Sequence, residues 1–459
     1  MKGLLILLPT LLFIAETAEI RNGTKILLSV QAMWRHGDRS PTKTYKGDYY
    51  QEAAWTFGGS GWGQLSPTGM RQHLKLGKRI RNRYISGNPY TNFLQPWYDS
   101  HEIYVRSTDV NRTIISAMSN MIGMYGQKDY NNGNQSYPQG LDQNAQYGDP
   151  VWPDGYVPIA VHTVDDDTDY IGNADATCQR QDQLWAMAKN SPELIAFINS
   201  PKTSNLLATL TQHCDQSVDI DNLWIVADAF LIEQIWQQDF QFRTPWWNTT
   251  LGATTVDVND QVELYQNGVF NDTLIMNNLD IGKELQTIRG GSIANDILMH
   301  ANIKLDCWRN NDTSSKCTWI NRNKYYVYSA HDTTLYAFFS CLGIQSKAVK
   351  PHGYPKYSAA VLFELWYDEA EAAPYFRLLY HDQDGHDFDS ITEDIPDCLG
   401  QTYCPLQVYV KYAERVKPPM PMDQWCQVDP TIQPSSNSFA QLTSFTGILM
   451  TILIGLLNF

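Results

Sequence analysis

The sequence predicts an α/β protein in which a mostly parallel sheet is flanked by helices and a smaller, mostly α domain is inserted. Three apolar runs, 26–34, 103–105 and 324–330, each indicate a strand that ends in charged residues and is followed by a helix. Residues 178–271 instead have apolar residues at three- and four-residue spacing, which is typical of helices. The alternation of strand and helix predicts the sheet, and the helical stretch predicts the insertion.

Composition narrows the class of protein. A chain of 459 residues is long enough for two or three domains, and 43% apolar residues indicate a globular fold rather than disorder. The net charge of −15 argues against nucleic acid as a partner, because phosphate backbones attract basic proteins.

The first strand leads into the stretch M-W-R-H-G-D-R-S-P-T, which holds Arg35, His36 and Arg39. Gly37 permits a sharp turn, and Pro41 discourages continuation of the strand. Two guanidiniums with fork-like donors suit a phosphate group, and an imidazole beside them suits attack on it. A short basic loop is more often a solvated surface, so the position after a strand is what favours a site here. The next helix is expected from Pro67 to about residue 84, with Ser66 as its N-cap.

The second and third strands repeat this design. Arg106 ends the second strand, before a helix over 110–124, and His331 and Asp332 end the third, before a helix over 333–342. Because parallel neighbouring strands end at one edge of a sheet, these side chains are predicted to meet those of the first stretch. Tyr357 to Tyr367 and Tyr375 to His381 are expected to form two antiparallel strands.

Between the second and third strands, two features are ambiguous. His162, in the short strand P-I-A-V-H-T, either lines the site or has a structural role. The run Asp165–Asp167 lacks the spacing of an EF-hand loop and is predicted to be a solvated loop.

The three charged stretches, R-H-G-D-R-S-P, R-S-T-D-V-N-R-T and H-D, resemble the motifs of the histidine acid phosphatases, which include the lysosomal and prostatic enzymes. The resemblance covers roughly residues 25–425 and implies a phosphoglycerate mutase-like fold. It implies that His36 is the nucleophile, forming a phosphohistidine intermediate, and that Asp332 is the general acid. It also implies that the phosphate is bound by Arg35, Arg39, Arg106 and His331. No metal or other cofactor is expected, since the arginines offset the phosphate charge.

The resemblance implies an acid phosphatase acting on small phosphate monoesters. Nearby guanidiniums would keep His36 neutral below the free imidazole pKa of about 6.5, which favours an acidic optimum. A phytase-like or lysophosphatidate phosphatase on the same fold is an alternative, as is a catalytically silent cell-surface binding protein. A homodimer is left open.

Residues 1–18 have the basic start, apolar core and small-residue exit of a secretory signal peptide. The α/β catalytic domain is expected over 19–145 and 272–425, the inserted domain over 146–271, and a linker over 426–444. The apolar end, 445–459, fits either a GPI-anchor signal or a single-pass type I anchor, so the catalytic domain would face the extracellular space or the lysosomal lumen. An amphipathic or core element is a third interpretation of this end.

Secretion makes the eight cysteines candidates for disulfides and the N-x-S/T sequons candidates for glycosylation. By resemblance, Cys178 pairs with Cys426 and Cys398 with Cys404. The remaining four are expected to pair as Cys307 with Cys317 and Cys214 with Cys341. Asn111 lies in a motif expected to be buried and is therefore predicted to be bare; glycans are predicted on Asn22, Asn134, Asn248, Asn271 and Asn311.

Overall fold

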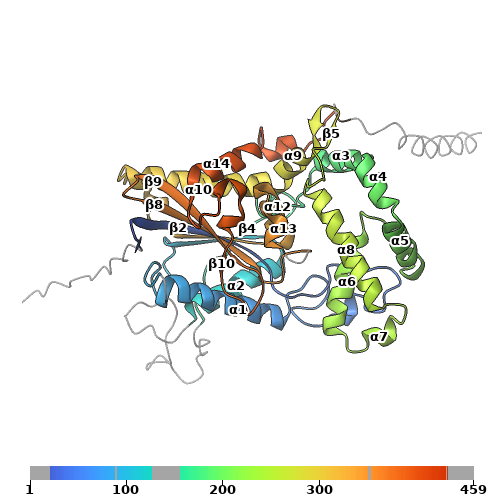
Figure 1. Cartoon of the computed structure of the whole chain (residues 1–459). Coiled ribbons are helices and arrows are strands. Elements are labelled where there is room, and N and C mark those ends of the chain that lie inside the picture. The colour runs from blue at the N-terminus through green and yellow to red at the C-terminus, as the bar shows by residue number, and fades with distance from the viewer. Residues whose placement is uncertain (1–20, 88–89, 127–155, 350–352, 431, 433–459) are drawn as a thin grey trace, which may run out of the picture.

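A central sheet organises the molecule, which we describe from a computed structural model covering residues 21–87, 90–126, 156–349, 353–430 and 432 (Figure 1). The strands follow the order β10-β9-β8-β2-β7-β3-β4, with β1 paired to β2 and β11 paired to β9. They are β1 (Arg21–Asn22), β2 (Lys25–Arg35), β3 (Ile103–Thr108), β4 (His162–Val164), β7 (Tyr325–Ala330), β8 (Ala360–Asp368), β9 (Ala373–His381), β10 (Asp389–Ser390) and β11 (Cys404–Pro405).

The predicted α/β class is confirmed, although the sheet is mixed rather than mostly parallel. Strands β2, β7, β3 and β4 run parallel to one another. On the other side of β2, strands β8, β9 and β10 are each antiparallel to the strand before them in the sheet. The register places Arg35 beside Ala330, so β2 and β7 end at the same level of the sheet. The residues that follow these two strands therefore start side by side.

Helices cover both faces of the sheet, which explains why β2 is apolar along most of its length. One face packs on α1 (Pro67–Arg81) and α2 (Asn111–Tyr125) through residues such as Trp34 and Leu76. The other face packs on α10, α12 and α14 through residues such as Met33 and Phe338. These helices are α10 (Ser292–Arg309), α12 (Asp332–Leu342) and α14 (Leu406–Arg415).

A group of helices lies to one side of the sheet and has a hydrophobic cluster of its own, which includes Leu206, Val226 and Val258 (Figure 1). Ser191 and Ser200 cap α4 and α5, and a proline follows each serine in the first turn. Strand β4 falls inside the range predicted for the insertion but belongs to the main sheet. The helices are α3 (Gln179–Ala188), α4 (Pro192–Ile198), α5 (Pro201–His213), α6 (Leu223–Trp236), α7 (Phe240–Arg243) and α8 (Thr249–Gln266).

The chain returns to the sheet through α9 (Ile281–Gln286), a π-helical segment (Thr287–Gly291) and α10. A π-helical segment (Asn82–Ser86) likewise extends α1. The shorter elements are β5 (Ile275–Met276), β6 (Leu279–Asp280), α11 (Thr318–Arg322), α13 (Gln345–Ala348), α15 (Met422–Trp425) and the 3-10 turns Glu52–Ala54, Thr392–Asp394 and Pro396–Cys398.

Three of the predicted disulfides form, and one does not. Cys178–Cys426, Cys307–Cys317 and Cys398–Cys404 are bonded, as expected. The predicted bridge between Cys214 and Cys341 is wrong, because both are free thiols. Cys214 is buried in the helical cluster beside the sheet, whereas Cys341 is a residue of α12 and is buried in the core against the sheet, so the two sulfurs belong to different cores.

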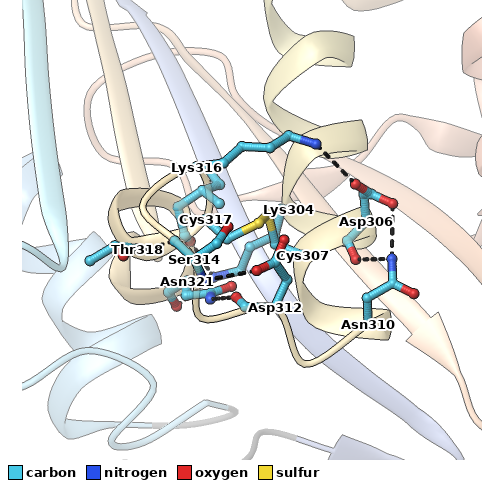
Figure 2. The surroundings of a disulfide bond; sticks show 11 residues. Lys304, Asp306, Cys307, Asn310, Asp312, Ser314, Lys316, Cys317, Thr318 and Asn321 are labelled. Carbon is cyan, nitrogen blue, oxygen red and sulfur yellow. Dashed lines mark hydrogen bonds and ion pairs between the residues drawn. A yellow bond between two sulfur atoms is a disulfide. The ribbon is translucent and has the colours of Figure 1, made fainter.

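The disulfide Cys307–Cys317 joins the end of α10 to the start of α11, just before β7 (Figure 2). Beside it, the buried Lys304 ammonium donates hydrogen bonds to the carbonyls of Ile320, Asn321 and Asn323 at 2.8, 3.0 and 2.9 Å. These carbonyls lie at the C-terminal end of α11, where the last carbonyls of a helix have no partner within it and a lysine can satisfy them. These contacts fix the chain that leads into β7 and the residues after it.

The predicted glycosylation sites Asn22, Asn248, Asn271 and Asn311 are all exposed. Asn111 is exposed too, at the start of α2, so the expectation that burial keeps it bare is wrong. Asn134, the predicted signal peptide and the apolar end lie outside the described residues. Within the described ranges, the helices are too short or too polar to span a membrane.

Candidate active site

The residues after β2 and β7 meet at one edge of the sheet, as the sequence predicts. The imidazole rings of His36 and His331 lie 5.7 Å apart between centroids. Arg35 Nη2 forms an ion pair with Asp332 Oδ2 at 2.8 Å. Four of the predicted site residues thus form one buried or mostly buried cluster.

The His36 ring has a defined orientation. Its Nδ1 lies 2.8 Å from the carbonyl oxygen of Gly37. A carbonyl can only accept, so Nδ1 carries the hydrogen and Nε2 of the neutral ring keeps its lone pair. Burial, followed by the positive charges of Arg112 and Arg39, holds the pKa of His36 well below its usual 6.5. The imidazole therefore stays neutral, with a lone pair on Nε2, even at acidic pH.

The turn after His36 is fixed by close packing on the first turn of α1. A side chain at Gly37 would put a Cβ atom 2.5 Å from Gly69 Cα, so glycine is required there. Ser66 caps α1 by accepting from the Gly69 N–H at 3.0 Å, and its hydroxyl donates to Asp38. The cap of α1 and the turn over residues 36–39, which we term the functional turn, are thus one hydrogen-bonded unit.

Two side chains of α6, from the helical group beside the sheet, also hold this turn. Asp228 accepts two hydrogen bonds from the Arg39 guanidinium, at 2.8 and 3.1 Å. The Trp236 indole donates to Asp38 Oδ1 at 3.0 Å. Neither residue is identified by the sequence analysis, because neither an acid nor a tryptophan in a mostly apolar helix has a local signal for a site.

His331 is oriented from two sides. Its Nε2 lies 3.0 Å from Thr108 Oγ1 and 3.8 Å from Asp166 Oδ1. Burial lowers the pKa of His331, while Asp166 acts in the opposite direction. The prediction that the whole run Asp165–Asp167 is a solvated loop is therefore wrong for Asp166, which is half-buried against the site because the turn that follows β4 folds over His331.

The arginines beside Asp332 favour its ionised form in the free protein. Burial would raise its pKa, but the Arg35 and Arg39 guanidiniums outweigh burial and hold the pKa below its usual value. Its position at the start of α12 also brings its Oδ1 within 3.0 Å of the Thr333 N–H, which donates to it.

Arg106 has a different setting from the one that the sequence analysis predicts for a phosphate-binding residue. Arg106 forms a buried ion pair with Asp169, and Asp169 also accepts from the backbone N–H groups of Ile171 and Gly172. Arg106 thereby anchors the turn that carries Asp166, and its charge is not among the largest influences on the pKa of His36, His331 or Asp332.

Arg112, in the first turn of α2, faces the cluster instead. Its charge is the strongest electrostatic influence on His36 after burial. Burial and the neighbouring Arg39 lower the pKa of Arg112 to about 10, so the guanidinium stays charged at acidic and neutral pH. A Cβ at Gly63 would lie 3.2 Å from Arg112 Nη1, so the glycine leaves room for this side chain.

Several buried donors of the cluster have no partner among the described residues. They are the Nε atoms of Arg35, Arg39 and Arg112 and the Tyr357 hydroxyl. Native proteins rarely leave buried donors unpaired without a functional reason. Three guanidiniums with free N–H groups around a neutral imidazole fit a bound oxyanion.

Two other features do not belong to this cluster. His162 is exposed on the edge strand β4 and stacks on Tyr104, with ring centroids 4.6 Å apart, so it has a structural role. The described part of the chain has no group of three or more His, Cys, Asp or Glu side chains arranged to hold a metal ion.

Comparisons with known proteins agree with this geometry. The family model "Histidine phosphatase superfamily (branch 2)" matches residues 26–381. "Putative acid phosphatase 10" of Caenorhabditis elegans is 30% identical over 421 residues, covering 91% of this chain and 98% of that protein. Prostatic acid phosphatase of Bos taurus is 28% identical, covering 91% of this chain and 92% of that protein. The solved structure of an apo phytase from Hafnia alvei has a TM-score of 0.56 at 16% identity, over 89% of this chain and all of that one, and so is similar in fold.

Proposed function

Because the chain belongs to branch 2 of the histidine phosphatase superfamily, we propose that the described cluster hydrolyses phosphate monoesters through a phosphohistidine intermediate on His36. The protein is an acid phosphatase on this proposal, like its curated relatives. The observation that carries the proposal is the free lone pair on His36 Nε2, surrounded by guanidiniums with unpaired donors.

In the first step, His36 Nε2 attacks phosphorus, a P–N bond forms and the ester P–O bond breaks. The departing oxygen keeps the bonding electron pair and takes a proton from Asp332. In the second step, water attacks phosphorus, the P–N bond breaks, and Asp332 takes the proton of the water. Arg35, Arg39 and Arg112 bind the non-bridging oxygens, and His331 adds a donor. In this proposal Arg112 takes the role that the sequence analysis assigns to Arg106.

The pH dependence follows from two pKa directions. The lowered pKa of His36 keeps the nucleophile neutral at low pH, so activity persists well below pH 6.5. Asp332 must gain a proton to act as acid, although its pKa is lowered in the free protein. A bound phosphate monoester competes for Arg35 and adds negative charge, which raises the pKa of Asp332. Activity is therefore expected to fall as pH rises and Asp332 loses this proton.

The test is hydrolysis by the full protein against pH, with small aryl and alkyl phosphates, inositol hexakisphosphate and lysophosphatidate as substrates. We expect an acidic optimum with small monoesters. Preference for inositol hexakisphosphate or lysophosphatidate would identify one of the alternative substrate classes. Phosphate binding without hydrolysis of any ester would instead indicate a catalytically silent protein.

Replacing Asp332 by Asn should separate proton donation from phosphate binding. Without the acid, alkyl phosphates should lose about 10²–10⁴-fold in kcat/KM, because an alkoxide leaves poorly. Nitrophenyl phosphate should lose much less, since nitrophenolate needs little help from a proton. The ratio of the two losses is the measurement; equal losses for both substrates would contradict the acid role.

Three bonded disulfides and acid phosphatase relatives support a location in the secretory pathway or the lysosome. We further propose a cleaved signal peptide over 1–18, glycans on the predicted sites Asn22, Asn134, Asn248, Asn271 and Asn311, and a membrane anchor at the apolar end, 445–459.

A further inference from the structure

We propose that Tyr357 is a further substrate-contacting residue, whose hydroxyl donates a hydrogen bond to an oxygen of the bound phosphoryl group. This inference rests on the proposed function and adds a neutral donor to its set of cationic ones. Tyr357 lies in the loop before β8, far in sequence from each of the three charged stretches.

The backbone around Tyr357 is tied to the functional turn by hydrogen bonds on both sides. The Ser358 N–H donates to the His36 carbonyl at 3.1 Å, and the Arg35 N–H donates to the Ala359 carbonyl at 2.9 Å. Before Tyr357, the Pro355 carbonyl accepts from Arg35 Nη1 at 2.7 Å. The position of Tyr357 relative to the nucleophile is therefore set before any ligand binds.

The ring of Tyr357 lies against the two residues that begin the first charged stretch. Arg35 Cζ is 4.2 Å from the ring centroid, a distance at which a guanidinium is attracted to an aromatic face. The His36 ring is 6.1 Å away between centroids. These contacts explain the position of the ring, but they give the hydroxyl no hydrogen-bond partner.

The hydroxyl of Tyr357 is buried and has no hydrogen-bond partner among the described residues. The charges that act on it include those of Arg39 and Arg35, two of the proposed phosphate-binding residues, and those of Asp228 and Asp38. Burial raises the pKa of Tyr357 to about 12, so the phenol keeps its proton at the pH of catalysis. A neutral hydroxyl among arginines can donate to an anionic oxygen without adding charge to the site.

The experiment is Tyr357→Phe in the full protein, which keeps the ring and its contact with Arg35 but deletes the hydroxyl. Because the hydroxyl has no partner in the described protein, the melting temperature without ligand should be unchanged or slightly higher. The inhibition constant of inorganic phosphate and the KM of nitrophenyl phosphate should rise about tenfold or more, the loss expected for a hydrogen bond to a charged group. The rise in melting temperature that phosphate causes should shrink in parallel.

Tyr325→Phe is the matched control. The Tyr325 hydroxyl is also buried without a partner among the described residues, but it lies at the opposite end of β7 from His331. This variant should keep the wild-type inhibition constant for phosphate.

Two results would overturn the inference for Tyr357 while the wild type remains active. One is an unchanged phosphate inhibition constant in Tyr357→Phe with an unchanged melting temperature, which would mean that the hydroxyl has no role. The other is an unchanged inhibition constant with a lower melting temperature, which would mean that the hydroxyl is structural. A wild type that neither hydrolyses phosphate monoesters nor is stabilised by phosphate would instead reject the proposed function itself.

Discussion

His36→Ala is expected to reduce kcat/KM for phosphate monoesters by roughly 10⁴-fold or more, the scale seen when an enzyme loses its nucleophile. The reason is specific to the ring: its Nδ1–H is committed to the Gly37 carbonyl, and Nε2 supplies the attacking lone pair. Rapid quenching in base with labelled substrate should trap a base-stable, acid-labile phosphoryl group on the wild type and none on the variant.

The control for His36→Ala is His162→Ala, which removes an exposed imidazole on β4 outside the cluster. It should retain wild-type kinetics and the trapped phosphoryl group. Turnover in His36→Ala close to that of the wild type would remove His36 from the mechanism, whatever the control shows.

Arg112→Ala should cost about 10²–10³-fold in kcat, as for the loss of one donor to transition-state charge. The free protein should not become less stable, because this guanidinium is buried beside the like charge of Arg39. The two measurements are steady-state kinetics and the melting temperature without phosphate.

Arg106→Ala should show the reverse pattern. Removing Arg106 leaves the buried Asp169 carboxylate without its cation, which typically destabilises a protein by about 3–5 kcal/mol. The protein that remains folded should keep most of its turnover, since Arg106 acts only by anchoring the turn around Asp169. If Arg106→Ala lost as much kcat as Arg112→Ala at unchanged stability, the phosphate-binding arginine would be Arg106 after all.

The sequence alone predicts that a residue belongs to the site where that residue directly follows an apolar run. Arg35, His36, His331 and Asp332 each stand at the end of a strand, and the parallel pairing of β2 with β7 brings them together. The same rule selected Arg106, because it too ends a strand. Arg112 lies further along the same motif, after the strand has ended and in the first turn of α2, and only the packing of α2 turns it towards His36.

What could not be predicted depends on contacts between segments far apart in the chain. Asp228 reaches Arg39 across 189 positions, and Asp166 reaches His331 from an acidic run that looks fully solvated. The incorrect bridge between Cys214 and Cys341 has the same origin, because pairing the remaining cysteines ignores which core each one enters.

The contact of α6 with the functional turn has a consequence for catalysis. On this helix, Asp228 accepts a hydrogen bond from Arg39, and Trp236 donates one to Asp38. The same helix carries Trp224, whose ring centroid lies 4.6 Å from Lys43 Nζ. Mutations that move α6 would therefore also shift Arg39 and Asp38. On the proposed mechanism, a change in α6 is thus expected to change catalytic power as well, even when it lies outside the buried cluster.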